Sequence, residues 1–147
     1  MYRKILVVTF GTELSNKAVT QAAQLAQAVG AKLLVLHVRS PVEAPAHVEG
    51  GALATLGAEK FSQEIYEEER KLLERAAAIA AKMGVTAQTA FIANLQPYEA
   101  IIKVSQEQGC DVIVMATRVR HGIPGYFLKS ETQKVLEHTD TPVLVVR

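Results

Sequence analysis

"KILVVTF" (residues 4–10) is an almost unbroken apolar run that is rich in β-branched residues. Such a run is typical of a strand that is covered on both faces, as in a parallel sheet flanked by helices. The runs "KLLVLHV" (residues 32–38) and "DVIVMA" (residues 111–116) have the same character. Two further strands are predicted at "TAQTAFIA" (residues 86–93), whose alternation suits a place nearer an edge, and at "TPVLVVR" (residues 141–147).

Apolar residues at helical spacing separate these strands. Helices are predicted over residues 16–29, 58–83, 97–108 and 126–138, and glycine follows each of the first three. Residues 39–57 hold prolines and glycines without a clear period, and they are interpreted as a long loop.

The alternation of strands and helices predicts a single α/β domain that spans residues 1–147. Parallel strands need crossover helices, and these crossovers are right-handed. A doubly wound, five-stranded parallel sheet in the order 3-2-1-4-5, with helices on both faces, is therefore expected. The carboxyl ends of the first and fourth strands, "TFGT" and "MATR", would then border the crevice where ligands bind in such sheets.

Composition narrows the classes of function. The net charge of +1 gives no reason to expect a nucleic-acid partner. Cys110 is the single cysteine, so an intramolecular disulfide is impossible. No run has the length of a membrane span, and the chain does not open with the pattern of a signal peptide. A cytoplasmic location without membrane contact is therefore expected.

Over its full length the sequence resembles the universal stress protein family. The resemblance rests on "KILVVTFGTELSNKAV", "AKLLVLHV", "QPYEAIIKVSQEQGCDVIVMATR" and the closing "SETQKVLEHTDTPVLVVR", which is the most specific of the four. It implies the α/β fold described above and a role in stress response. It also implies a nucleotide-binding-like crevice, because some members of the family bind ATP there and others do not.

The members that bind ATP carry a glycine-x-x-glycine, nine residues, and then glycine followed by Ser or Thr. Glycines in that pattern let backbone N–H groups approach the phosphates closely. In this sequence the three glycine positions read Ala116, Val119 and Lys129, and Ser130 alone matches. The usual aspartate after the first strand is replaced by Phe10.

These departures predict that ATP is not bound in the usual pose and that the chain has no cofactor. The alternative is a sensor of ATP, AMP or cyclic AMP in which basic side chains replace the missing backbone contacts. The candidate binding residues are Phe10, Gly11, Thr12, Thr117, Arg118, Lys129 and Ser130. The favoured interpretation of the basic loop is that it is solvated and holds no anion, because surface cations are common. Phe10 is expected to pack and plug the crevice rather than stack on a base.

No catalytic motif is present: the sequence lacks a P-loop, a nucleophile elbow and paired carboxylates at a strand end. We therefore expect a non-enzymatic binding module in stress response that acts through protein partners. The last strand would leave an apolar edge open, which proteins cover to avoid aggregation. The resemblance implies pairing across a two-fold axis, so a homodimer is predicted through Val143, Leu144, Val145 and Val146.

Other features are given structural interpretations. "YEEERK" (residues 66–71) predicts a solvated helix face with local ion pairs. His37 is interpreted as a satisfied core or strand-end histidine, and Cys110 as packing. Neither His37 nor His138 has a partner at ligand spacing, so no metal site is predicted.

Overall fold

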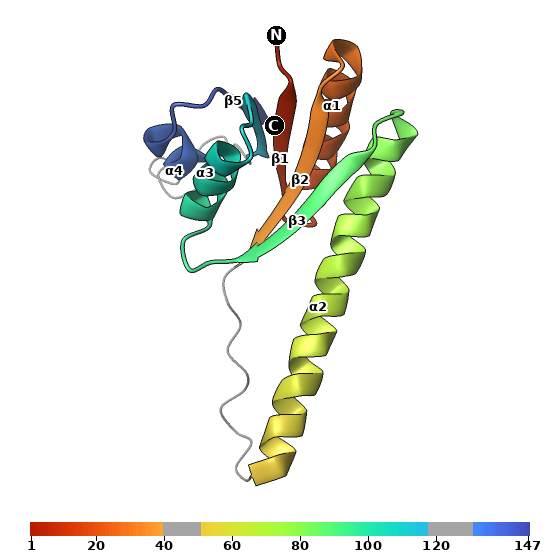
Figure 1. The fold of residues 1–147 in the computed structure, drawn as a ribbon, viewed down its shortest axis with the longest axis vertical. Helices are drawn as coiled ribbons and strands as arrows, with labels where there is room; N and C mark the ends of the chain where they lie inside the picture. The colour runs from red at the N-terminus through yellow and green to blue at the C-terminus, as the bar shows by residue number, and fades with distance from the viewer. Residues whose placement is uncertain (40–50, 118–130) are drawn as a thin grey trace, which may run out of the picture.

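The computed structural model describes residues 1–39, 51–117 and 131–147, and for residues 51–62 it describes the backbone alone. Strands and helices alternate along the chain, as the apolar runs predicted (Figure 1). The elements are β1 (Lys4–Thr9), α1 (Glu13–Val29), β2 (Lys32–Arg39), α2 (Gly51–Lys82), β3 (Ala87–Ala93), α3 (Pro97–Glu107), β4 (Val112–Ala116), α4 (Glu131–His138) and β5 (Val143–Val146).

The five strands form one parallel sheet in the order β3-β2-β1-β4-β5, which confirms the predicted topology. The strand order reverses at β1, which pairs with β2 on one side and with β4 on the other. This reversal places the carboxyl ends of β1 and β4 side by side at the topological switch point.

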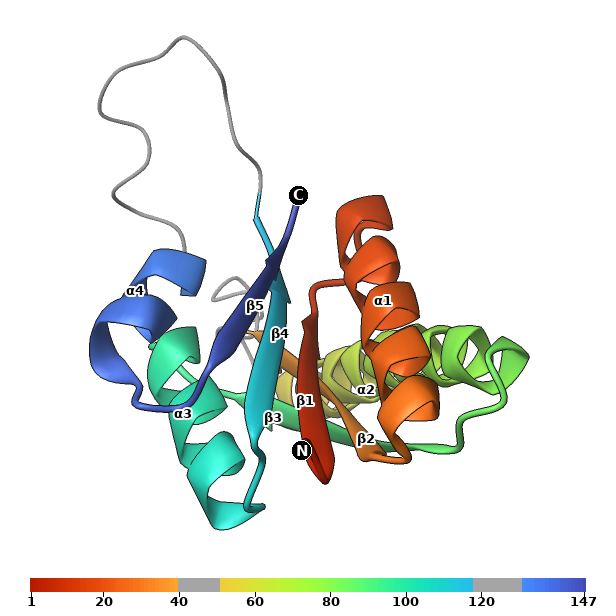
Figure 2. The same ribbon diagram turned by 90° about the horizontal axis from the view of Figure 1, so that it is seen from above.

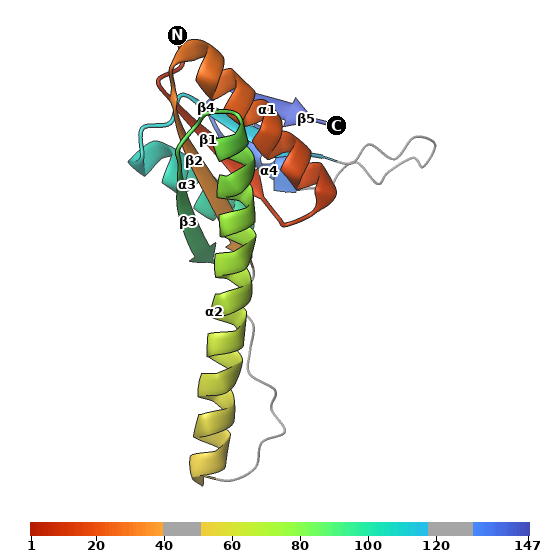
Figure 3. The same cartoon turned by 90° about the vertical axis from the view of Figure 1, so that its right-hand side faces the viewer.

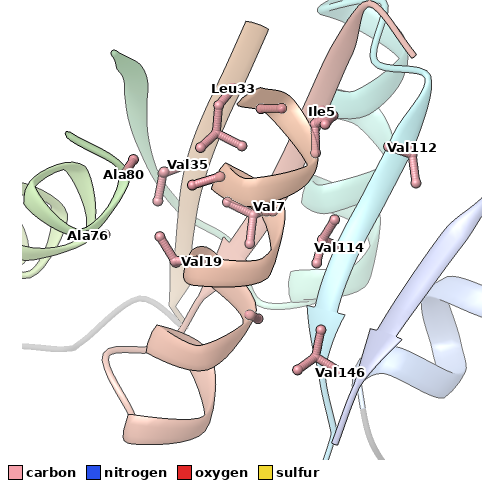
Figure 4. Close-up of a cluster of buried hydrophobic side chains, with 14 of the residues drawn as sticks. Ile5, Val7, Val19, Leu33, Val35, Ala76, Ala80, Val112, Val114 and Val146 are labelled. Carbon is pink, nitrogen blue, oxygen red and sulfur yellow. The ribbon is translucent and has the colours of Figure 1, made fainter. Parts of the chain in front are cut away.

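Alternate residues of the central strands enter two separate cores, because successive side chains of a strand point to opposite faces. Ile5 and Val7 face the core that α1 and α2 cover, and Leu6 and Val8 face the core that α3 and α4 cover. Figure 2 shows the two helix pairs on opposite sides of the sheet. Figure 4 shows the first core, where Val19 of α1 and Ala76 of α2 meet the sheet.

Helix α2 begins at Gly51, so the predicted loop over residues 39–57 is wrong from residue 51 onward, and β2 includes Arg39. The segment "GALATLGAEK" supplies good helix formers, and each interior glycine costs only about 1 kcal/mol relative to alanine, so it need not end a helix. Residues 40–50 lie outside the described residues. The resulting helix runs well past the end of the sheet (Figure 3).

The last strand, β5 (Val143–Val146), is shorter than the predicted one over residues 141–147. The described part of the fourth helix is Glu131–His138, and residues 126–130 of the prediction lie outside the described residues. β5 forms the edge of the sheet beside β4. Within the described ranges, no helix combines the length and apolar character that a membrane span requires.

Candidate functional site

The crevice at the switch point is bordered by the residues that follow β1 and β4. Because the two strands run parallel in register, with Ile5 opposite Val112, both end at the same edge of the sheet. Phe10, Gly11 and Thr12 follow β1, and Thr117 follows β4. The remaining predicted site residues, Arg118, Lys129 and Ser130, lie outside the described residues, as does Val119.

The loop between β1 and α1 satisfies its own polar groups. Ser15 Oγ accepts a hydrogen bond from Phe10 N at 3.0 Å, and Thr9 Oγ1 accepts one from Gly11 N at 3.2 Å. Thr12 is the N-cap of α1, and its Oγ1 accepts from Ser15 N at 3.1 Å. The amides of Phe10 and Gly11 are therefore engaged within the loop.

Gly11 is required by the approach of α2 to this loop. Its φ is 74°, a left-handed conformation that residues with a side chain rarely adopt. A Cβ at this position would also lie 2.5 Å from Leu72 Cδ1 in α2. The glycine that matches the family pattern thus has a packing role in this chain.

Phe10 does not form the buried plug that the sequence predicted. Its side chain is 37% exposed, whereas Thr9 immediately before it is fully buried. β1 ends at Thr9, which is opposite His37 in the last pair with β2. Phe10 therefore lies beyond the paired part of the sheet.

Carboxylates stand at the two helix N-termini that face this edge. Glu13 lies in the first turn of α1. Glu131 reaches across from α4, where its Oε2 accepts a hydrogen bond from Tyr98 N in the first turn of α3 at 2.9 Å. Each negative group is favourable beside the positive end of a helix dipole. Together they oppose the binding of a further anion at the same place.

The carboxyl ends of β4 and β5 are tied together and to α4. Thr117 N donates to Val146 O at 2.9 Å, and Thr132 Oγ1 donates to Ala116 O at 3.3 Å. Ala116, which occupies the first glycine position of the family pattern, is the last residue of β4.

A buried charged cluster beneath the crevice was not foreseen from the sequence. Glu69 of α2 is 6% exposed, and its two carboxylate oxygens meet different cationic groups of β2. Arg39 Nη1 pairs with Oε1, and His37 Nε2 lies 2.5 Å from Oε2. His37 Nδ1 lies 2.7 Å from Thr9 O, and the imidazole stacks on Phe91 at 5.8 Å between ring centroids. The prediction that His37 is satisfied in the core is confirmed.

The prediction of a solvated face at residues 66–71 is wrong for Glu69. The surrounding residues of that stretch are exposed, and the predicted local pairing is present as a contact of 2.7 Å between Arg70 and Glu67. The spacing carried a signal for the buried carboxylate, because Glu69 precedes the buried Leu73, Ala76 and Ala80 at helical intervals.

Cys110 has no role at the crevice. Burial raises the pKa of the Cys110 thiol, which lowers its reactivity. Among the residues that the structure describes, no three His, Cys, Asp or Glu side chains gather as metal ligands would.

The strand order defines a doubly wound α/β protein, a class in which ligands bind at the switch point. The model of the universal stress protein family matches residues 1–147, and the chain belongs to that family. The universal stress protein YxiE of Bacillus subtilis is 35% identical over 152 residues, with all of both chains covered.

Two solved structures share the fold at lower identity. A universal stress protein in complex with cAMP has a TM-score of 0.73 and 24% identity, and the match covers 99% of this chain and 97% of that one. The universal stress protein from Archaeoglobus fulgidus in complex with dAMP has a TM-score of 0.67 and 17% identity, over 99% and 98% of the two chains.

Proposed function

We propose that this chain is a non-enzymatic binding module that works in stress response as a homodimer paired through β5. The observation that carries the proposal is the open edge of the sheet at that strand. In the part of the chain that the structure describes, β5 pairs with β4 alone, and Leu144 is 40% exposed. Open apolar edges are sites of strand pairing with another chain.

The backbone of β5 supports this pairing. Ile113 N donates to Pro142 O and Thr117 N donates to Val146 O, so the even-numbered residues turn toward β4. Successive residues of a strand direct their backbone groups to opposite sides. The N–H and C=O groups of Val143 and Val145 therefore face the open edge. A second copy related by a two-fold axis would satisfy them.

The crevice supports a function without ATP in the usual family pose. The amides of Phe10 and Gly11 are engaged within their loop, and Glu13 and Glu131 place negative charge at the nearby helix N-termini. Ala116 also stands in place of the first motif glycine, one of the residues that let backbone N–H groups approach a phosphate.

Light scattering on the purified chain tests the dimer. The wild type is expected to have the mass of two chains at micromolar concentration, and Leu144→Lys the mass of one, because a charge would be buried at the pairing edge. Leu136→Lys is the matched control, since Leu136 is 50% exposed on α4 and outside the strand. A monomeric wild type, or a dimer that Leu144→Lys leaves intact, would contradict the proposal.

The second candidate function is an adenine-nucleotide sensor with a rebuilt basic pocket. It is favoured by the cAMP and dAMP complexes of the two similar structures, whose fold this chain shares. Cationic side chains at Arg118 and Lys129 would then take over from the missing glycines.

Isothermal titration calorimetry with magnesium-ATP, AMP and cAMP separates the two functions. We expect no binding heat up to millimolar ligand. Micromolar binding that the double substitution Arg118→Ala and Lys129→Ala abolishes would establish the sensor instead. Nucleotide binding that survives this substitution would contradict both the proposal that the crevice binds no nucleotide and the proposal that Arg118 and Lys129 hold one.

A further inference from the structure

The sheet has a second open edge, at β3, on the far side from β5. β3 pairs with β2 alone, and none of its seven residues is fully buried. In contrast, β1, β2 and β4 are buried over most of their length. This edge is therefore only partly covered by the described parts of the chain.

The direction of the β3 backbone follows from one hydrogen bond. Asn94, which directly follows the strand, donates its N–H to Arg39 O of β2 at 2.9 Å. Because backbone groups alternate in direction, the even-numbered residues of β3 face β2. Ala87, Thr89 and Phe91 consequently turn their N–H and C=O groups to the open edge.

A groove of about 550 Å³ lies along this edge, between β3 and α2. Its strand side includes Ala87, Thr89 and Phe91, and its helix side includes Tyr66, Leu73 and Ala77. These are the same β3 residues whose backbone groups face outward. The groove thus combines outward-facing main-chain groups of β3 with a helix wall that carries both apolar residues and the charged Glu69, Arg70 and Glu74.

The charged residues around the groove are already paired. Glu69 is held by Arg39 and His37. Arg70 contacts Glu67 at 2.7 Å and also pairs with Glu74. A charged group entering the groove would have to break one of these pairs, so an uncharged occupant is favoured.

We propose that this groove binds an extended, uncharged segment of a partner protein as an additional strand on β3. A groove between a strand edge and a helix suits such a ligand, because the edge supplies main-chain hydrogen bonds and the helix side supplies contacts for alternate side chains. The apolar side chains of the segment would point toward Leu73 and Ala77, and Tyr66, which is 65% exposed, would close over them.

This inference rests on the proposed function as a binding module, and it is independent of the dimer because β3 and β5 lie at opposite ends of the sheet. Leu144→Lys, which removes the dimer, is expected to leave peptide affinity within about twofold of the wild-type value. The experiments therefore distinguish a failure of the dimer proposal from a failure of the groove proposal.

Two substitutions test the groove, each with a matched control. Thr89→Pro removes an outward N–H and leaves the hydrogen bonds to β2 in place, whereas Thr89→Val keeps that N–H. Ala77→Phe fills the groove, whereas Ala78→Phe adds the same ring at the next, exposed position of α2. Circular dichroism and thermal unfolding establish that each variant is folded.

The probe is a displayed library of random peptides of about eight residues, roughly the length of a long edge strand. Selection on the wild type is expected to enrich uncharged peptides with apolar residues at alternate positions. Fluorescence anisotropy of the selected peptides should show affinity about tenfold weaker for Thr89→Pro and for Ala77→Phe, and within twofold of wild type for both controls.

Three results would overturn the proposal. The first is a selection that enriches no peptide, and the second is binding that neither Thr89→Pro nor Ala77→Phe weakens. The third is self-association of the wild type that Thr89→Pro abolishes and Leu144→Lys does not, which would make β3 a contact between copies of this chain.

Discussion

Glu69 joins helix α2 to strand β2 from a buried position. Its Oε1 pairs with Arg39, and its Oε2 lies 2.5 Å from His37 Nε2 in a close ion pair rather than an aligned hydrogen bond. The carbonyl oxygen of Thr9 can only accept, so His37 Nδ1 carries a proton.

Glu69→Gln is expected to lower the free energy of unfolding by about 2–4 kcal/mol, because it removes a buried carboxylate that pairs with Arg39 and contacts His37. Glu67→Gln removes a carboxylate from the same helix at a side chain that is 53% exposed, and should change the value by less than about 1 kcal/mol. Urea unfolding of the three proteins measures the difference. Equal effects of the two substitutions would show that burial of Glu69 does not matter for stability.

Helix α1 illustrates how local sequence specifies an element. Thr12 caps its N-terminus, and Gly30 ends it with a φ of 69°. The expected glycine at the end of the helix was visible in the sequence. The hydrogen bonds by which Thr12 and Ser15 hold the loop were not, because they depend on the loop conformation.

Thr12→Ala should destabilise the protein by about 1 kcal/mol through the loss of the cap, whereas Thr12→Ser keeps a hydroxyl and should stay close to wild type. Thermal or urea unfolding provides the measurement. If alanine and serine are equally tolerated, the hydroxyl contributes no capping energy at this position.

Asp111 binds the N-terminal end of the chain, although it lies more than a hundred residues further along the sequence. Its Oδ2 accepts hydrogen bonds from Arg3 N at 2.5 Å and from Lys4 N at 2.9 Å. These backbone donors hold the pKa of Asp111 below its ordinary value of 3.8. The contact therefore links the stability of the folded chain to pH.

A lowered pKa in the folded state means that the carboxylate contributes stability above the unfolded-state pKa. That contribution is lost as the pH falls from about 3.8 through the folded-state value. Asp111→Asn should consequently be less stable than wild type at pH 7, and the difference should shrink in acid below that range. Urea unfolding as a function of pH checks this, with Asp140→Asn at an exposed position as the control. A difference that does not depend on pH would contradict the role of the charge.

The strands, their parallel order and the presence of helices on both faces followed from the apolar runs and the crossover rules. The apolar side chains of a run such as residues 4–10 can be buried only where helices cover both faces of the sheet. The crossover rules then leave few possible orders for five such strands. The start of α2 did not follow, because glycine and proline near residues 41–57 match a loop as well as a helix end.

Tertiary structure decided which polar groups are buried and which edges are open. Glu69 lies in an acidic stretch that looks solvated, and it is buried only because α2 crosses the sheet beside His37 and Arg39. Phe10 is apolar and yet exposed, because β1 ends one residue before it. Sequence periodicity specifies the direction of a side chain relative to its own element. The partner that it meets depends on the packing of elements far apart in the chain, and the groove between α2 and β3 exists only at that level.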